Sequence, residues 1–191
     1  MIEPDRPQLR ADAQHNRQHI LDVARAKLSV APNASLNSIA KAAGVGPGTL
    51  YRHFANREAL LVELYRREIE RLVQSAPAML RAHEPLTALR LWVEALAQEI
   101  RLKHGFGEAL QPGTHESITR ETYRPVAGAI DLLLDAGREA DTVRSGVDAG
   151  DLLLMLGFVS RTEPGTQGDA KIARLIGLLI DGLSVPTSTR S

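Results

Sequence analysis

The residues whose types and spacing could support chemistry are concentrated in one short stretch of the 191-residue chain. Small, hydroxyl, guanidinium and imidazole groups follow one another there: Gly48, Thr49, Tyr51, Arg52 and His53. Hydroxyl and guanidinium groups donate hydrogen bonds to phosphate oxygens, and an arginine side chain can bind two acceptors on the edge of guanine. Residues 23–57 contain no Asp or Glu, so no carboxylate of this segment would repel a phosphate. The stretch is a candidate surface for binding nucleic acid.

The charge distribution also indicates that the N-terminal part of the chain could bind phosphates. The whole chain has 23 basic and 23 acidic residues, which gives a formal net charge of zero. Residues 1–57 hold eight basic and four acidic residues, so this part carries +4 and the remainder carries −4. A difference of four charges also arises by chance, so it supports phosphate binding only together with the acid-free segment.

Helical spacing of apolar residues predicts the elements that hold this stretch. A first helix begins near Arg17 and has one apolar face: Ile20, Val23, Ala24 and Leu28. A second, short helix follows Ser35, whose hydroxyl can cap a helix N-terminus. It ends at Gly44, where the chain needs a residue that tolerates a left-handed backbone.

A third helix is predicted to carry the polar residues. Gly46 can serve as its N-cap, and Pro47 suits its first position, where a missing N–H costs nothing. Leu50 and Phe54 are one turn apart, so they face the core together and leave the polar side chains outside. Two short helices joined by a tight glycine turn, after a longer helix, are typical of a helix-turn-helix unit.

Residues 17–65 resemble the N-terminal signature of TetR-type repressors. The resemblance is carried by Ser38, Ile39, Ala40, Ala43, Gly44, Val45, Gly48, Thr49, Leu50, Tyr51, Arg52, His53, Phe54, Arg57, Glu58, Ala59, Leu60 and Leu61. It implies a dimeric bacterial transcription factor that represses by binding a palindromic operator. In such proteins a variable C-terminal body binds a small molecule, which changes the spacing of two DNA-reading units. The body of this chain identifies no effector.

The resemblance also implies roles for individual residues. Thr49 and Tyr51 match phosphate contacts of the family, and Arg57 replaces its usual lysine. The family often has a serine and a basic residue just before Gly48, and this chain has neither, so no base preference can be transferred. Arg52 and His53 are candidates for contacting base edges, and His53 could equally contact phosphate. The full predicted DNA-binding set is Ser38, Pro47, Gly48, Thr49, Tyr51, Arg52, His53 and Arg57.

The rest of the chain is predicted to be helical, because apolar stripes recur and no strand pattern alternates. Pro77 is expected to interrupt the helix that begins at Asn56, and a later helix is bent or begun at Pro125. The fold class is all-α, with a helix-turn-helix head, a helical-bundle body and about nine helices. The predicted parts are a flexible arm (1–16), a DNA-binding domain (17–60), a ligand-binding and dimerisation domain (61–185) and a flexible tail (186–191).

Bulky side chains of the body could line a pocket for a largely apolar effector, or they could simply fill the core. The pocket candidates are Met79, Trp92, Leu96, His104, Phe106, Tyr123, Met155 and Phe158. The last two helices are apolar on two sides, more than one small bundle can cover, so a homodimer interface is predicted there. Its predicted residues are Leu152, Leu156, Gly157, Val159, Ile172, Leu175, Ile176, Leu179, Ile180 and Leu183.

Other classes of function have less support. The chain contains no cysteine, which excludes disulfides and thiol nucleophiles. His15 and His19 have the spacing of metal ligands, but no third ligand follows in register, so neither a metal nor a cofactor is expected. No catalytic motif is present, so the chain is not expected to be an enzyme.

No apolar run approaches the roughly 20 residues of a membrane span, and the N-terminus has acids where a signal peptide has bases, so a cytoplasmic protein is expected. A helical small-molecule carrier or enzyme, and a transcriptional activator of the same fold, remain the alternatives.

Overall fold

The computed structural model describes residues 6–106 and 109–185, so the expected tail at 186–191 lies outside it. Over these ranges it has eight α-helices, a 3-10 helix and no strand, which confirms the all-α class and comes close to the expected nine helices. Contacts divide the chain into two units. The first comprises the residues up to Tyr65 together with Gly105–His115, and the second comprises Arg66–His104 together with the residues from Glu116 onward.

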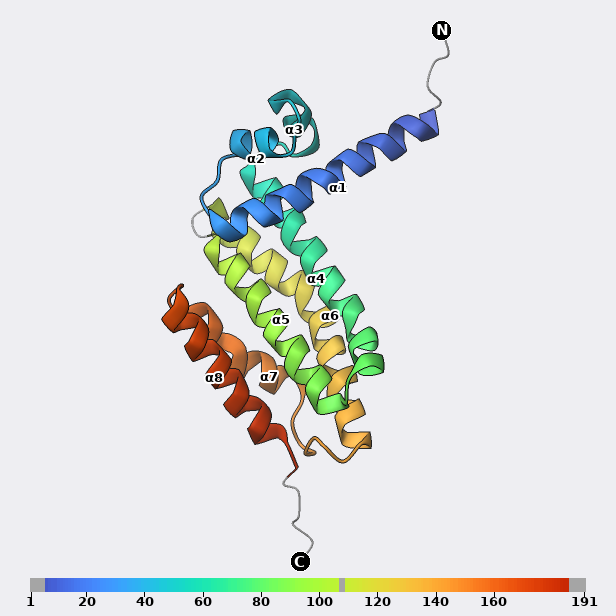
Figure 1. Ribbon diagram of the computed structural model, residues 1–191, viewed down its shortest axis with the longest axis vertical. Coiled ribbons are helices and arrows are strands. Elements are labelled where there is room, and N and C mark those ends of the chain that lie inside the picture. Colours follow the sequence, from blue (N-terminus) through green and yellow to red (C-terminus); the bar gives the residue numbers. More distant parts are fainter. Residues whose placement is uncertain (1–5, 107–108, 186–191) are drawn as a thin grey trace, which may run out of the picture. The chain divides into compact units, whose positions relative to one another are not determined.

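The first unit is built on three helices and the start of a fourth (Figure 1). They are α1 (Arg6–Val30), α2 (Leu36–Ala42), α3 (Pro47–His53) and α4 (Arg57–Ala82). Each contributes leucine, isoleucine or phenylalanine side chains that are at most 2% exposed: Ile20, Leu28, Ile39, Leu50, Phe54, Leu60, Leu61 and Leu64. Burial of these side chains is the main stabilising term of this unit.

α1 is longer than the sequence indicated. The sequence predicted a flexible arm over residues 1–16 and a helix from Arg17, but the helix begins at Arg6, and residues 1–5 of this arm lie outside the described part. The apolar stripe starts at Ile20, so periodicity could not detect the earlier turns. Arg, Gln and Ala have high helix propensity, and Pro7 suits the first turn of a helix, which accounts for the extension.

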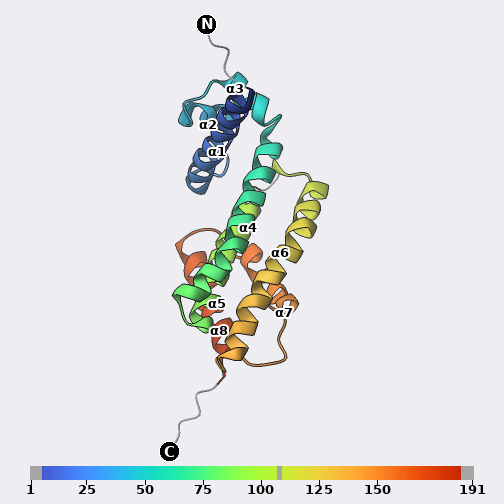
Figure 2. The same cartoon turned by 90° about the vertical axis from the view of Figure 1, so that its right-hand side faces the viewer.

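The second unit contains the rest of α4 and four further α-helices. They are α5 (Pro85–Gly105), most of α6 (Pro112–Glu139), α7 (Ala149–Met155), which continues into the 3-10 helix η2 (Leu156–Arg161), and α8 (Thr166–Leu183). Within this unit α4, α5 and α6 run beside one another (Figures 1 and 2). Trp92 of α5 is fully buried, and its Nε1 donates a hydrogen bond of 2.9 Å to the Leu72 carbonyl of α4.

Two helices contain prolines at which the sequence predicted an interruption (Pro77) and either a bend or a helix start (Pro125). α4 runs through Pro77 to Ala82, and α6 runs through Pro125 as one helix. A proline inside a helix costs about 3 kcal/mol because it removes a hydrogen bond and crowds the preceding turn. Both prolines are exposed, whereas their neighbours Ala76 and Val126 are buried. Tertiary packing on the buried side therefore offsets the local penalty.

Candidate nucleic-acid interface

The turn between α2 and α3 is fixed by two backbone hydrogen bonds. Gly44 has a φ of +67°, and its N–H donates to the Lys41 carbonyl at 3.2 Å. The Val45 N–H donates to the Ala40 carbonyl at 3.0 Å. These bonds form a Schellman motif, whose left-handed residue is most often glycine. The predicted role of Gly44 is confirmed, and this residue sets the direction in which α3 leaves α2.

α3 is held on the core of the first unit by its apolar side. Leu50 is fully buried, and Phe54 is 1% exposed. The Arg17 guanidinium lies 4.9 Å from the centroid of the Phe54 ring and pairs with Glu63 at 2.8 Å. A cation stacked on an aromatic ring and tied to a carboxylate stabilises that ring in place. The apolar side of α3 is therefore fixed, and its opposite side faces outward.

The outer side of α3 brings six of the eight predicted DNA-binding residues together. Tyr51 has 48% of its surface exposed, which is unusual for an aromatic side chain in a small core domain. α3 begins as predicted, with Gly46 as N-cap and Pro47 at its first position. The exposure of the other five is graded: Pro47, Gly48 and Arg52 are exposed, and Thr49 and His53 are half-buried.

The Arg52 side chain lies back along α3. Its Nε donates to the Gly48 carbonyl at 3.2 Å, and its Nη2 donates to the Thr49 hydroxyl at 3.4 Å. Both bonds are exposed to solvent, and such bonds contribute only about 0.5–1.5 kcal/mol. Arg52 can therefore exchange them for bonds to phosphate or base at small cost.

Ser38 and Arg57, the other two predicted DNA-binding residues, form hydrogen bonds within the chain. The Ser38 hydroxyl donates to the Ser35 carbonyl at 2.8 Å, and the Ser38 N–H donates to the Ser35 hydroxyl, which caps α2 as predicted. Arg57 donates to the carbonyls of Pro32 and Ala34 in the turn between α1 and α2. Burial lowers the pKa of Arg57, although a guanidinium stays charged at neutral pH. Their DNA contacts remain predictions.

Glu58 is a residue whose contacts the sequence analysis missed. It lies in the first turn of α4 and accepts a hydrogen bond of 3.0 Å from the Gln111 N–H, 53 positions further along the chain. Hydrogen bonds from the Thr114 side chain and the Gln111 backbone lower the pKa of Glu58. No local pattern could have indicated this contact, because only the tertiary structure brings the two segments together.

Two family models match this chain. Residues 20–64 match the model described as bacterial regulatory proteins, tetR family, and residues 84–185 match the model described as the C-terminal domain of SbtR-like transcriptional regulators. The structure is also similar to the TetR transcriptional regulator SCO0520 from Streptomyces coelicolor, with a TM-score of 0.77 and 33% identity over 90% of this chain and 99% of that chain. The chain belongs to the TetR family of transcriptional regulators. It is thus a DNA-binding helix-turn-helix protein, as the signature in its first 65 residues predicted.

Further relatives of this TetR-family protein match it to different extents. A TetR regulatory protein from Mycobacterium vanbaalenii is 28% identical, with a TM-score of 0.70 over 93% of this chain and 99% of that chain. The HTH-type transcriptional regulator SAUSA300_2515 from Staphylococcus aureus is 39% identical over 64 residues. That match covers 32% of this chain and 35% of the relative, so it spans about a third of the curated protein's length.

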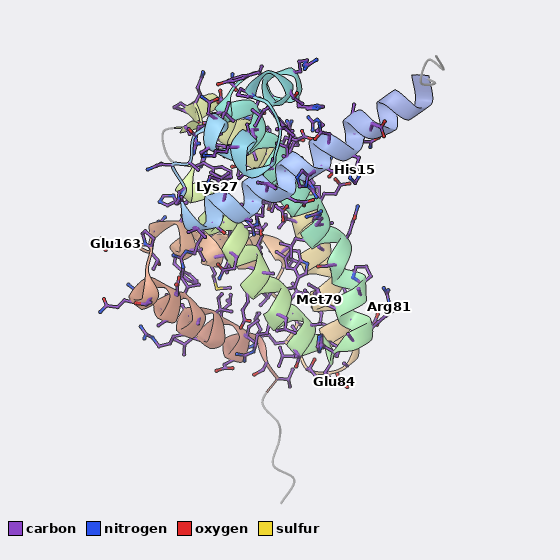
Figure 3. All side chains as sticks on the ribbon, turned by 45° about the horizontal axis from the view of Figure 1, so that its top comes forward. His15, Lys27, Met79, Arg81, Glu84 and Glu163 are labelled. Carbon is purple, nitrogen blue, oxygen red and sulfur yellow. The ribbon has the colours of Figure 1, made fainter. Side chains whose placement is uncertain are left out.

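The predicted pocket residues do not share one environment. Trp92, Leu96 and Phe106 are buried, Met79 and Phe158 are half-buried, and His104, Tyr123 and Met155 are exposed. Trp92 fills the core of the second unit, whereas Phe106 belongs to the first unit by its contacts. Met79 lies near the C-terminal end of α4 (Figure 3). The structure therefore does not bring these eight residues together, because bulk and adaptability mark core residues as well as pocket residues.

A polar cavity of about 570 Å³ lies in the loop between η2 and α8. It is lined by residues 161–168 and Lys171, and none of the predicted pocket residues borders it. Glu163 marks this loop in Figure 3. The cavity therefore does not correspond to the predicted pocket.

The predicted dimer interface requires a correction. Seven of its ten residues are at most 3% exposed within the single chain: Leu152, Leu156, Val159, Ile172, Ile176, Ile180 and Leu183. The other three, Gly157, Leu175 and Leu179, are half-buried. The apolar stripe of these helices covers the chain's own core, and a buried side chain has no surface left for a partner. The exposed apolar side chains on α7 and α8 are instead Leu154 (82%), Met155 (44%) and Leu178 (62%).

Two general findings concern the part of the chain that the structure describes. None of its helices combines the length and apolarity that crossing a membrane requires. Its His, Asp and Glu side chains form no group of three or more that could hold a metal ion.

Proposed function

We propose that this protein is a ligand-responsive repressor that binds a palindromic operator as a dimer and is released by a small-molecule effector. The α3 helices of the two protomers enter successive major grooves, about 34–36 Å apart. Phosphate contacts by Thr49 and Tyr51 position each helix, and Arg52 is available to read a base edge.

The observation that carries this proposal is the outer face of α3. Tyr51 and Arg52 are exposed on this face, whereas Thr49 and His53 are half-buried. The other side of the helix is fixed by Leu50 and Phe54. A Cβ on Gly48 would meet no heavy atom within 4 Å, so the fold does not require glycine there. A glycine that the fold does not need, on an exposed polar helix face, suits close approach of a DNA backbone.

Dimerisation is proposed through the exposed faces of α7 and α8. Dimers are typical of this family, and Leu154, Met155 and Leu178 leave apolar surface uncovered on these helices. Covering such side chains is favourable by about 25 cal/mol per Å² of apolar surface. A two-fold axis through this face gives the two α3 helices the symmetry of a palindrome.

The effector is proposed to bind in the second unit, whose interior is largely apolar, and to favour a conformation that does not fit the operator. To change the bound fraction from 99% to 1%, it must bind the non-operator conformation more tightly by about 5.5 kcal/mol. The two protomers share this requirement if each binds one effector molecule.

The experiment measures binding of the purified chain to the DNA that flanks its own coding region, against a scrambled duplex, at about 50 and 200 mM salt. We expect selective binding that falls steeply with salt, because basic side chains release counterions from the DNA. Equal binding to both duplexes at both salt concentrations would contradict the proposal.

A matched pair of variants locates the contact. Arg52→Ala removes a positive charge from α3, and Arg120→Ala removes one from an exposed position on α6. We expect Arg52→Ala to weaken operator binding at least tenfold, an arginine contact to a base being worth about 1–3 kcal/mol. Arg120→Ala should bind as the wild type does, and equal losses in both variants would mean that α3 does not contact the DNA.

A further inference from the structure

The core of the second unit contains an acidic side chain. Among the residues that the structure describes, Glu99 of α5 is the one charged residue that is buried, with 7% of its surface exposed. Trp92 and Leu96 precede it at helical spacing on the same face of α5, and both are buried. The Glu99 carboxylate therefore continues an apolar stripe and does not lie on the polar side of the helix.

The stability of the fold does not account for a carboxylate at this position. Moving an ionised carboxylate out of water is costly unless opposite charge or hydrogen-bond donors surround it. Even a well-paired buried ion often stabilises a protein no more than an apolar side chain of similar volume does. Glu99 thus occupies a position at which folding favours an apolar residue, and a charge in an apolar interior marks a candidate binding site.

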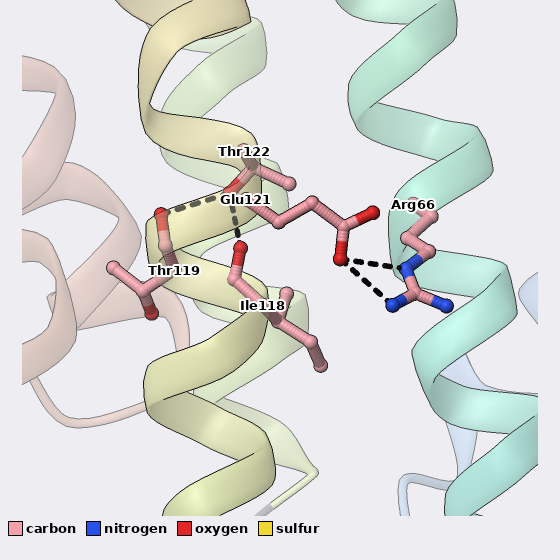
Figure 4. Close-up of polar contacts among 5 residues, drawn as sticks. All are labelled: Arg66, Ile118, Thr119, Glu121 and Thr122. Carbon is pink, nitrogen blue, oxygen red and sulfur yellow. Dashed lines mark hydrogen bonds and ion pairs between the residues drawn. The ribbon is translucent and has the colours of Figure 1, made fainter.

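Lys103 lies one turn after Glu99 on the same face of α5. Partial burial lowers the pKa of Lys103, and its Nζ donates a hydrogen bond of 2.8 Å to the Thr119 hydroxyl of α6. Thr119 is exposed, and its side chain lies on the side of α6 away from Arg66 (Figure 4). The three residues Glu99, Lys103 and Thr119 all belong to the second unit. The Lys103 ammonium group is therefore held near the surface, whereas Glu99 lies deeper in the unit.

The order of these side chains along α5 indicates which ligand would fit them. Apolar side chains at Trp92 and Leu96 are followed by a buried carboxylate and then by a lysine that bonds to an exposed hydroxyl. Apolar residues cover the body of a ligand, and a few charged groups select its polar head. A buried carboxylate pairs best with a cation, and it repels an anionic head strongly because little water screens the charges.

We propose that Glu99 determines the specificity of the effector site, and that the effector is an amphiphilic amine. Its ammonium group pairs with the Glu99 carboxylate, and its apolar part packs against Trp92 and Leu96. This inference rests on the proposed function. It narrows the expected class from a largely apolar effector to an apolar molecule with one positive group.

Three probes and two variants test this proposal. n-Octylamine, which is protonated at neutral pH, is compared with 1-octanol and octanoate, which have the same alkyl chain. Glu99→Gln removes the charge and keeps the size of the side chain, and Glu94→Gln removes a charge from a half-buried position on another face of α5 as the control. Calorimetry on the full chain measures the affinities. The emission of Trp92, the single tryptophan of the chain, reports binding near it.

The wild type and Glu94→Gln should bind octylamine at least tenfold more tightly than they bind the alcohol or the carboxylate. Glu99→Gln should bind octylamine at least tenfold more weakly and lose this preference. If Glu99→Gln fails to fold, the comparison of the three probes on the wild type carries the test. Equal affinities of the wild type for the three probes, or equal octylamine affinities of the two variants, would overturn the inference.

Release of operator DNA separates this inference from the proposed function. Octylamine should release the operator from the wild type, and half-release should need at least tenfold more amine with Glu99→Gln. Amine binding through Glu99 without release of the operator would overturn the effector role of the site and leave the proposed repressor intact. A wild type that selects no DNA in the absence of amine would contradict the proposed function, and the comparison of probes would still decide whether Glu99 selects amines.

Discussion

Replacing Gly48 should affect folding stability and DNA binding in opposite directions. Its backbone is not left-handed and a Cβ would meet open space, so alanine fits the folded chain. We expect Gly48→Ala to raise the free energy of unfolding by about 0.5–1 kcal/mol, because alanine is the better helix former. The same change should weaken operator binding several-fold if the DNA backbone approaches this position. Urea unfolding and a DNA titration on one preparation measure both effects, and unchanged affinity would show that the DNA lies elsewhere.

Contacts between residues far apart in the sequence could not be predicted from the sequence. Ser38 and Arg57 were identified through the family signature, but their partners in the turn before α2 became visible only in the structure. The same holds for the ion pair between Arg17 and Glu63, 46 positions apart, which helps to hold α3 in place. Local patterns indicate which residues are polar and exposed, whereas their partners depend on the packing of helices.

At the scale of the elements, the Schellman motif predicts that replacing Gly44 by alanine lowers the free energy of unfolding. Replacing Gly128, a glycine inside a helix, is the control and should raise it. Gly44→Ala puts a Cβ on a left-handed backbone, so we expect a loss of about 1 kcal/mol in the free energy of unfolding. Gly128→Ala lies in α6 with open space around the new Cβ, and should raise the same free energy by up to about 1 kcal/mol. Denaturant unfolding of both variants checks the prediction, and a stabilised Gly44→Ala would contradict it.

Helix caps around the helix-turn-helix unit were predictable, whereas the start of α1 and the continuity of helices through prolines were not. Ser35, Gly44 and Gly46 act as the sequence predicted, because caps depend on a few neighbouring residues. The passage of α4 through Pro77 depends instead on packing against other helices, which periodicity does not report.

At the scale of the whole molecule, the exposed leucine on α8 tests the corrected dimer face. We expect Leu178→Glu to raise the dimer dissociation constant at least tenfold, because a charge would be buried against the partner. Leu132→Glu changes a leucine of α6 that is 43% exposed, and should leave the dimer intact. Sedimentation at several concentrations distinguishes the two, and an unaffected Leu178→Glu dimer would place the interface elsewhere.

The dimer interface predicted from the sequence shows what an apolar stripe can and cannot indicate about dimer formation. A hydrophobic stripe such as the one through Ile172, Ile176 and Ile180 predicts that a helix face is covered. It does not say whether the cover is the same chain or a second copy. The structure decides that these three side chains face the chain's own core.

The central claim is that the outer face of α3 contacts DNA, and one pair of tyrosines tests it most directly. Tyr51 on α3 and Tyr123 on α6 are 48% and 49% exposed. Operator affinity is measured for Tyr51→Ala and Tyr123→Ala alongside their melting temperatures. We predict at least tenfold weaker binding for Tyr51→Ala on every duplex, with an unchanged melting temperature, and wild-type binding for Tyr123→Ala. Equal operator affinity in the two variants would contradict the account.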